Sequence, residues 1–182
     1  MSATYEYLQY ALELGFTRAA CADGLTLQCK PDLRAFCNKE QCTSFGTSWV
    51  CPPGCGTLED CQNRLQGFQS GIVLQSVYRA PSAVSSQPKL KRLQHEHNMR
   101  FLRLADQARS NDSEVLPLTT GGCIICETCT YPAQPCREPA RQFQSLSAHG
   151  IDVAALCGWV GFDFSFREDQ VTYIACLLVN KM

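Results

Sequence analysis

The sequence predicts an α/β or α+β fold: a single layered domain with about four core strands, helices packed on the sheet, and two cysteine-rich metal-binding loops. Segments of strand composition alternate with segments of helical periodicity, which is typical of layered domains. The length of 182 residues suits one sizeable core. Cysteine, at 13 of 182 residues, gathers in two stretches with little periodicity. We therefore expect one domain, residues 1–182, with an N-terminal cluster loop at 29–61 and a C-terminal cluster loop at 119–139.

Helices are predicted where apolar residues recur every three or four positions. One of them begins after Thr57, a good N-cap residue, with Asp60 as a capping-box partner three positions later. The longest follows a Pro/Ser-rich linker at residues 80–88. The expected helices cover residues 4–14, 57–68, 89–109, 139–148 and 152–158.

Strands are predicted in short runs rich in β-branched residues between turn signals. The run at 114–118 is of special interest because it delivers the chain into Gly121, Gly122 and the second cysteine loop. The expected strands cover residues 16–21, 71–78, 114–118 and 171–179.

Bulk composition narrows the functional classes. The net charge is −1, so no overall field favours nucleic acid or a membrane surface. The longest apolar run, at residues 171–179, is half the length of a membrane span, and no export signal is evident. We therefore expect a cytoplasmic protein, and in a reducing cytosol clustered thiols bind metal more often than they form disulfides. An odd number of cysteines also argues against a complete disulfide framework.

The second cysteine group has the spacing of a cluster-binding loop. Its sequence is C-x2-C-x2-C with a fourth thiol seven residues later, which is the usual ligand pattern of a [4Fe–4S] cluster. Zinc is the alternative, although structural zinc usually takes two separated C-x2-C pairs. Arg137, next to the last thiol, could stabilise the negative charge of the cluster or lie in solvent. The predicted ligands are Cys123, Cys126, Cys129 and Cys136.

The first group is less regular and offers five thiols where one cluster needs four. Cys51 precedes two prolines, a rigid ending similar to that of ferredoxin ligand runs. Cys61 falls in the first turn of a predicted helix, where a thiolate is favoured. The thiols of this group are Cys37, Cys42, Cys51, Cys55 and Cys61.

Two long motifs in the sequence are specific: C-x4-C-x2-F-G-x2-W-x-C-P-P followed by G-T-L-E-D-C, and C-x2-C-x2-C-T-Y-P-x2-P-C-R-x-P. With these motifs the chain resembles a family of cysteine-rich prokaryotic proteins of unknown function, labelled as predicted metal-binding and presumed to carry iron–sulfur clusters. The resemblance implies a first ligand set without Cys55, which is not a regular family position and stays an alternative ligand. That implied set is Cys37, Cys42, Cys51 and Cys61.

Several other residues have expected roles. Cys157 and Cys176 lie in apolar runs and are expected to fill the core. Cys29, like Cys55, is a candidate fifth thiol near the first cluster. His97 lies on the apolar stripe of the long helix and is expected to be a hydrogen-bonded core histidine. The remaining expectations are a surface or capping role for His149 and packing roles for Trp49 and Trp159.

The long predicted helix has a basic outer face. It is either a solvated surface or a docking patch for an acidic redox partner such as a ferredoxin or flavodoxin. No dinucleotide-binding, P-loop or nucleophile-elbow motif is present in the sequence. The basic residues are Lys89, Lys91, Arg92, Arg100, Arg103 and Arg109.

These observations support three functional interpretations. The first is a protein with two [4Fe–4S] clusters that acts in cytosolic electron transfer or as a redox subunit. The second is an enzyme that uses a cluster with an exchangeable iron near Cys55 for sulfur or reductive chemistry. The third is a structural or sensory metal-binding module. The sequence names no substrate and no oligomeric state.

Overall fold

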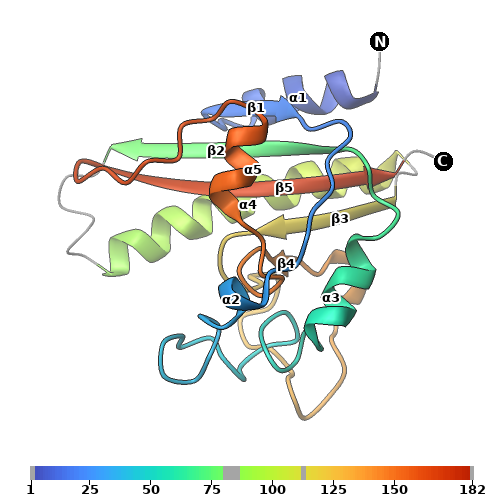
Figure 1. The fold of residues 1–182 in the computed structure, drawn as a ribbon, viewed down its shortest axis with the longest axis vertical. Coiled ribbons are helices and arrows are strands. Elements are labelled where there is room, and N and C mark those ends of the chain that lie inside the picture. The colour runs from blue at the N-terminus through green and yellow to red at the C-terminus, as the bar shows by residue number, and fades with distance from the viewer. Residues whose placement is uncertain (1–2, 80–86, 112–113, 181–182) are drawn as a thin grey trace.

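The computed structural model describes residues 3–79, 87–111 and 114–180. In this part of the chain five strands form one sheet in the order β1-β2-β5-β3-β4 (Figure 1). All neighbours are antiparallel except β3 and β4, which run parallel. The expected layered α/β or α+β domain is confirmed, and of the linker expected at 80–88, residues 80–86 lie outside the described ranges. The strands are β1 (Arg18–Cys21), β2 (Gly71–Arg79), β3 (Glu114–Thr119), β4 (Gln144–Ser145) and β5 (Gln170–Asn180).

The two central strands, β2 and β5, supply side chains to both faces of the sheet. Successive side chains of a strand point to opposite faces. Ile72 and Leu74 accordingly belong to one buried cluster, whereas Val73 belongs to another. Both faces are buried, and this explains why the strand sequences are almost continuously apolar.

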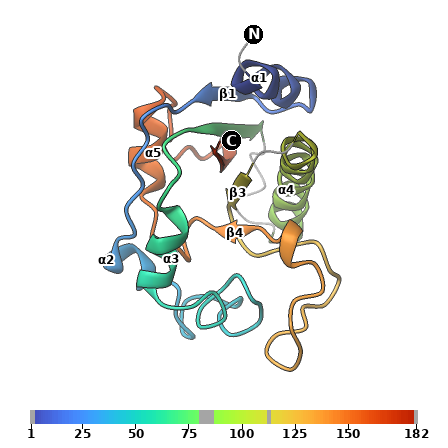
Figure 2. The same ribbon diagram turned by 90° about the vertical axis from the view of Figure 1, so that its right-hand side faces the viewer.

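Helices α1 (Ala3–Glu13) and α4 (Gln87–Ser110) cover one face of the sheet, and α5 (Val153–Trp159) covers the other (Figure 2). On the first face Phe101 of α4 packs with the strand residues Ile72 and Leu74. On the second face Cys157 of α5 packs with Cys176 of β5. Both thiols are fully buried, so the expectation that they fill the core is confirmed.

Local capping fixes the start of α3 (Leu58–Leu65), as the sequence predicts. The backbone N–H of Asp60 donates to the Thr57 hydroxyl at 3.1 Å, and the Thr57 N–H donates to the Asp60 carboxylate at 2.7 Å. This reciprocal pair satisfies two N–H groups that the helix leaves free. A further short helix, α2 (Pro31–Arg34), was not expected.

The helix expected at 139–148 is wrong. The chain forms a short 3₁₀ helix, Pro139–Arg141, and then β4, whose residues Gln144 and Ser145 pair with Leu118 and Thr119 of β3. The backbone groups of β4 form hydrogen bonds with β3 at the edge of the sheet, in place of the helical hydrogen bonds that the local periodicity predicts. The packing role expected for Trp159 is also wrong, because this residue is 60% exposed at the end of α5.

Both cysteine loops lie at one end of the molecule, beyond the β4 edge of the sheet (Figures 1 and 2). Helices α2 and α3 lie between these loops and the layered part of the domain. No helix within the described ranges has the length and apolar character needed to cross a membrane.

Candidate metal centre

The second cysteine loop leaves the sheet from a turn that α4 and β5 hold in place. The Thr119 hydroxyl donates to Asn98 Oδ1 at 2.7 Å, and Asn98 Nδ2 donates to the Thr120 carbonyl at 3.3 Å. The Thr120 hydroxyl donates to the Ile174 carbonyl at 2.9 Å. Gly121 follows with φ +84°, a conformation that favours glycine. The loop therefore begins at a fixed position.

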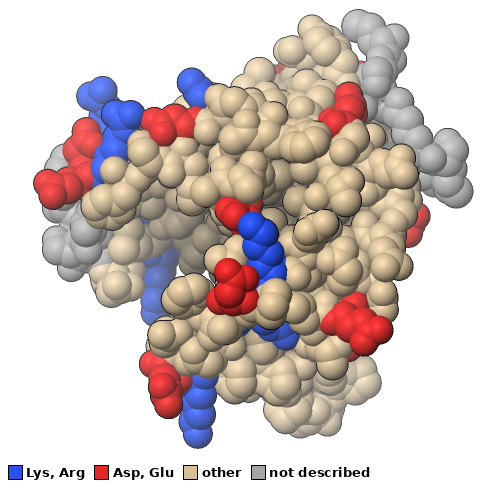
Figure 3. Space-filling model, in the orientation of Figure 1, with Lys and Arg blue, Asp and Glu red and all other residues tan. Residues whose placement is uncertain are grey.

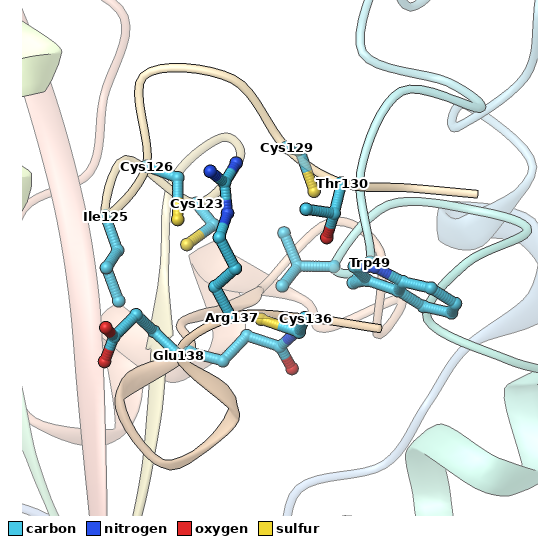
Figure 4. Close-up of a pocket in the computed structure, with 11 residues that line it drawn as sticks. Trp49, Cys123, Ile125, Cys126, Cys129, Thr130, Cys136, Arg137 and Glu138 are labelled. Atoms are coloured by element: carbon cyan, nitrogen blue, oxygen red, sulfur yellow. The ribbon is translucent and has the colours of Figure 1, made fainter. Parts of the chain in front are cut away.

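The four thiols of this loop line one cavity (Figure 4). In the view of Figure 4, the sulfurs of Cys123 and Cys126 lie on one side and that of Cys129 lies across from them. Trp49 and Val50 of the first loop also line the cavity, so both loops build it. Burial raises the pKa of Cys123. Four thiols around one cavity are a donor set for an iron–sulfur cluster or for zinc.

Arg137 shares this cavity with the thiols. In Figure 4 its side chain runs between the sulfurs, and its guanidinium donates a hydrogen bond to the Thr128 carbonyl. The structure therefore brings a positive charge to the predicted ligands of the second group. A cluster in this cavity would require Arg137 to take another rotamer.

Three thiols of the first loop lie near one another. The charges of Cys42 and Cys51 act on Cys37, although burial has the larger effect and raises its pKa. Burial likewise raises the pKa of Cys51, and this thiol also interacts with Cys123 and Cys129. Cys51 therefore lies between the two predicted ligand sets.

Direct contacts hold the two loops together. The rings of Trp49 and Tyr131 pack edge to face with centroids 4.9 Å apart, and Trp49 Nε1 donates to the Gln134 carbonyl at 3.2 Å. A Cβ atom at Gly54 would lie 2.5 Å from the Ser48 carbonyl and 2.8 Å from the Tyr131 ring. The packing role expected for Trp49 is confirmed, and the loops form one unit.

Cys61 lies in a different group, which we call the buried thiol cluster: Cys29, Cys55 and Cys61 with Ala148. Cys61 is fully buried, and Cys55 is 2% exposed. The Cys55 thiol donates a hydrogen bond to the Cys61 sulfur, which raises the pKa of Cys55 and lowers that of Cys61. Of the first predicted set, the structure brings together Cys37, Cys42 and Cys51 and places Cys61 with Cys55.

Two arginines face the Cys61 sulfur. Arg34 Nη1 lies 3.3 Å from it and Arg64 Nη1 lies 3.5 Å from it. These contacts favour the thiolate of Cys61. Burial, together with the charge of Cys61, raises the pKa of Cys29 to about 11.

The surface or capping role expected for His149 is wrong. The side chain is fully buried, its Nδ1 lies 3.0 Å from the Ser145 carbonyl, and its Nε2 lies 3.4 Å from Arg64 Nη1. It also interacts with the Cys61 sulfur and helps to lower the pKa of that thiol. The position of His149 directly before Gly150 suggested an exposed turn. The tertiary fold packs this turn against α3, which the local sequence does not indicate.

The sequence was compared with protein families, with curated proteins and with solved structures. Residues 23–179 match the model of family DUF2284, described as a predicted metal-binding protein. The chain belongs to this family. The DUF2284 match includes both cysteine loops and the buried thiol cluster, and it confirms the resemblance seen in the motifs. The searches of curated proteins and of solved structures gave no match.

Proposed function

We propose that this metal-binding protein carries two [4Fe–4S] clusters and transfers electrons. The observation that carries the proposal is the convergence of Cys123, Cys126, Cys129 and Cys136 on one cavity. Their spacing is that of a cluster-binding loop, and Trp49 and Val50 of the first loop also line the cavity. The proposal also places the protein in a reducing compartment such as the cytosol, because thiolates must stay reduced to bind iron.

The separation of the thiols favours a cluster over a single ion. Among the described residues, no three Cys, His, Asp or Glu side chains lie close enough to hold one metal ion. Zinc–sulfur bonds of about 2.3 Å would require four sulfurs within about 4 Å of one another. A cube places its own irons and sulfides between the thiolates and so accepts more widely spaced ligands.

The first cluster would be held by Cys37, Cys42 and Cys51. Since Cys51 also interacts with Cys123 and Cys129, the two proposed clusters would be neighbours. Such clusters supply one-electron chemistry when bound. This chain would contribute the thiolates, the turn at Thr120 and Gly121, and the Arg137 charge, which favours the reduced and more negative form.

A second candidate function is an iron–sulfur enzyme. Three thiols in the first set would leave one iron without a cysteine ligand, since Cys61 contacts Cys55. An iron of this kind can bind a substrate as a Lewis acid. The iron would then be exchangeable because Cys61 lies away from the other three thiols. Cys55 would not be needed as an extra ligand.

Electron paramagnetic resonance on reduced, anaerobically purified protein tests both candidates. Two interacting cluster signals that small anionic ligands leave unchanged would support the electron carrier. A signal that shifts with added ligand would support the open iron. Metal analysis that returns zinc alone would exclude both and favour a structural module.

We propose that the basic side of α4 receives an acidic redox partner of the ferredoxin or flavodoxin type. Lys91, Arg92 and Arg103 are exposed there, whereas Arg100 is bonded to Glu96 and Arg109 to Asp106. The opposite face of the molecule has scattered charges of both signs (Figure 3). Reversing Lys91 and Arg92 to Glu should slow reduction by ferredoxin at low salt and have little effect at high salt. If the variant and the wild type are reduced at equal rates at low salt, this surface is not the docking site.

A further inference from the structure

The buried thiol cluster has no role in the proposed electron transfer. Its two central thiols, Cys55 and Cys61, are hydrogen-bonded to each other and come from opposite sides of the Thr57 cap. They are not joined in a disulfide. Arg34 and Arg64 both contact the Cys61 sulfur, so a negative charge on that sulfur is stabilised. Two thiols in contact, with a buried sulfur that can accept the proton of its neighbour, are an arrangement suited to thiol–disulfide exchange.

An open cleft of about 260 Å³ reaches one of these two thiols and not the other. Cys55 lines the cleft, with Trp49 and Arg64, whereas Cys61 does not. Gln144 also lines it, is 8% exposed, and its Oε1 atom has no hydrogen-bond partner among the described residues. A buried acceptor without a donor is costly, so a ligand with a hydroxyl or amino group would be favoured here.

We propose that Cys55 and Cys61 form a redox-active dithiol that reduces a small disulfide bound in this cleft. Cys55 is the nucleophile because it faces the cleft, and Cys61 is the resolving thiol because it lies behind Cys55. The substrate class is a disulfide that carries a hydroxyl or amino group, from which Gln144 Oε1 would accept a hydrogen bond. This activity does not depend on either iron–sulfur cluster.

The exchange proceeds in two steps. Cys55 passes its proton to the Cys61 sulfur across their hydrogen bond, and the Cys55 thiolate attacks one sulfur of the substrate. The substrate S–S bond breaks, and the first half of the substrate leaves as a thiolate that takes a proton from water. The Cys61 sulfur then attacks Cys55, which releases the second substrate thiol with the proton of Cys61 and leaves a Cys55–Cys61 disulfide. Two electrons pass from the dithiol to the substrate, which is the oxidant.

The test uses bis(2-hydroxyethyl) disulfide as the probe on the full-length protein under anaerobic conditions. Peptide mapping without reductant should find a Cys55–Cys61 disulfide in the wild type. The Cys61→Ser variant should instead retain a mixed disulfide on Cys55, and Cys55→Ser should form neither product. Cys29 belongs to the same cluster and could resolve the mixed disulfide when Cys61 is absent. The double variant Cys29→Ser/Cys61→Ser removes this route and should retain the mixed disulfide on Cys55. Cys157→Ser, in the core, is the matched control and should behave as the wild type.

Either of two results would overturn the proposal: a wild type whose Cys55 and Cys61 stay reduced, or probe attached to other cysteines as often as to Cys55. The wild-type experiment needs no substitution, so a variant that fails to fold does not affect it. Iron content and visible absorbance measured on the same sample report separately on the clusters. A protein without iron that still forms the disulfide would contradict the proposed function and support this inference.

Discussion

The Nη1 atom of Arg34 lies 3.3 Å from the Sγ atom of Cys61, which comes 27 positions later in the sequence. The same guanidinium donates to the carbonyl of Gly56 at 2.8 Å and to that of Ala148. One side chain of α2 therefore joins the start of α3 to the segment after β4. This link holds the buried thiol cluster between the first cysteine loop and the segment after β4.

Replacing Arg34 with Met should destabilise the protein. The substitution keeps the length of the side chain and removes every donor, which leaves the carbonyls of Gly56 and Ala148 without this partner. We expect a loss of about 3 kcal/mol in the free energy of unfolding, measured by urea denaturation. Arg103→Met, on the exposed side of α4, is the control and should change stability by less than about 0.5 kcal/mol. Equal losses in the two variants would show that the Arg34 contacts contribute nothing.

Gly54→Ala should separate the two cysteine loops. The added methyl group would meet the Ser48 carbonyl and the Tyr131 ring at distances no Cβ atom adopts. We expect a loss of about 1–3 kcal/mol in unfolding free energy, with less iron retained on purification. Gly158→Ala is the matched control, because nothing lies within 4 Å of a Cβ at that position in α5. It should retain full iron content and gain up to about 1 kcal/mol. If Gly54→Ala binds as much iron as the control, close packing of the loops is not needed for metal binding.

His97 should make folding stability depend on pH. The expected core histidine is confirmed: the ring is fully buried, and its Nδ1 lies 2.9 Å from the Ser76 hydroxyl. Burial lowers the pKa of His97 to about 3, and Arg100 contributes in the same direction. The unfolded state therefore binds a proton as pH falls below about 6.5, while the folded state stays neutral.

The contribution of His97 to the free energy of unfolding is therefore present at neutral pH and is lost as the pH falls below about 6.5. Between about pH 7 and pH 5 the loss should be about 2 kcal/mol. Urea denaturation at the two pH values measures it, and His97→Gln should remove this part of the pH dependence. His95→Gln, on the exposed side of the same helix, should leave it unchanged. An unaltered pH dependence in His97→Gln would show that His97 does not keep a lowered pKa.

Cys126→Ser should remove one cluster and leave the other. Serine lacks the thiolate, and the remaining three thiols of the second loop would hold iron less tightly. We expect about half of the iron to be lost, with the first cluster signal retained. Cys21→Ser, a half-buried thiol on β1 outside both loops, is the control and should retain all the iron. Full iron content in Cys126→Ser would exclude Cys126 as a ligand.

Local signals in the sequence predicted much of this fold. The Thr57–Asp60 capping box identified the start of α3, and apolar runs between turn signals identified β2, β3 and β5. These features depend on residues close together in the chain, so pattern and propensity are sufficient. The second predicted ligand group was visible for the same reason, since its four thiols share one loop.

Features that depend on long-range packing were not predictable. β4 exists because Gln144 and Ser145 meet the end of β3, and no local pattern indicates that pairing. His149 is buried against Arg64 only because the segment after β4 folds back on α3. The separation of Cys61 from Cys37 has a similar cause: the Cys61 sulfur contacts Arg34, Cys55 and the Ala148 carbonyl, and spacing along the chain does not encode these contacts.

The central claim is that iron and sulfide hold the two cysteine loops, and their content in anaerobically purified protein tests it most directly. We predict about eight irons and eight acid-labile sulfides per chain, with Mössbauer parameters of [4Fe–4S] clusters. Protein that is folded and fully reduced but contains zinc, or no metal, in place of iron and sulfide would contradict the account.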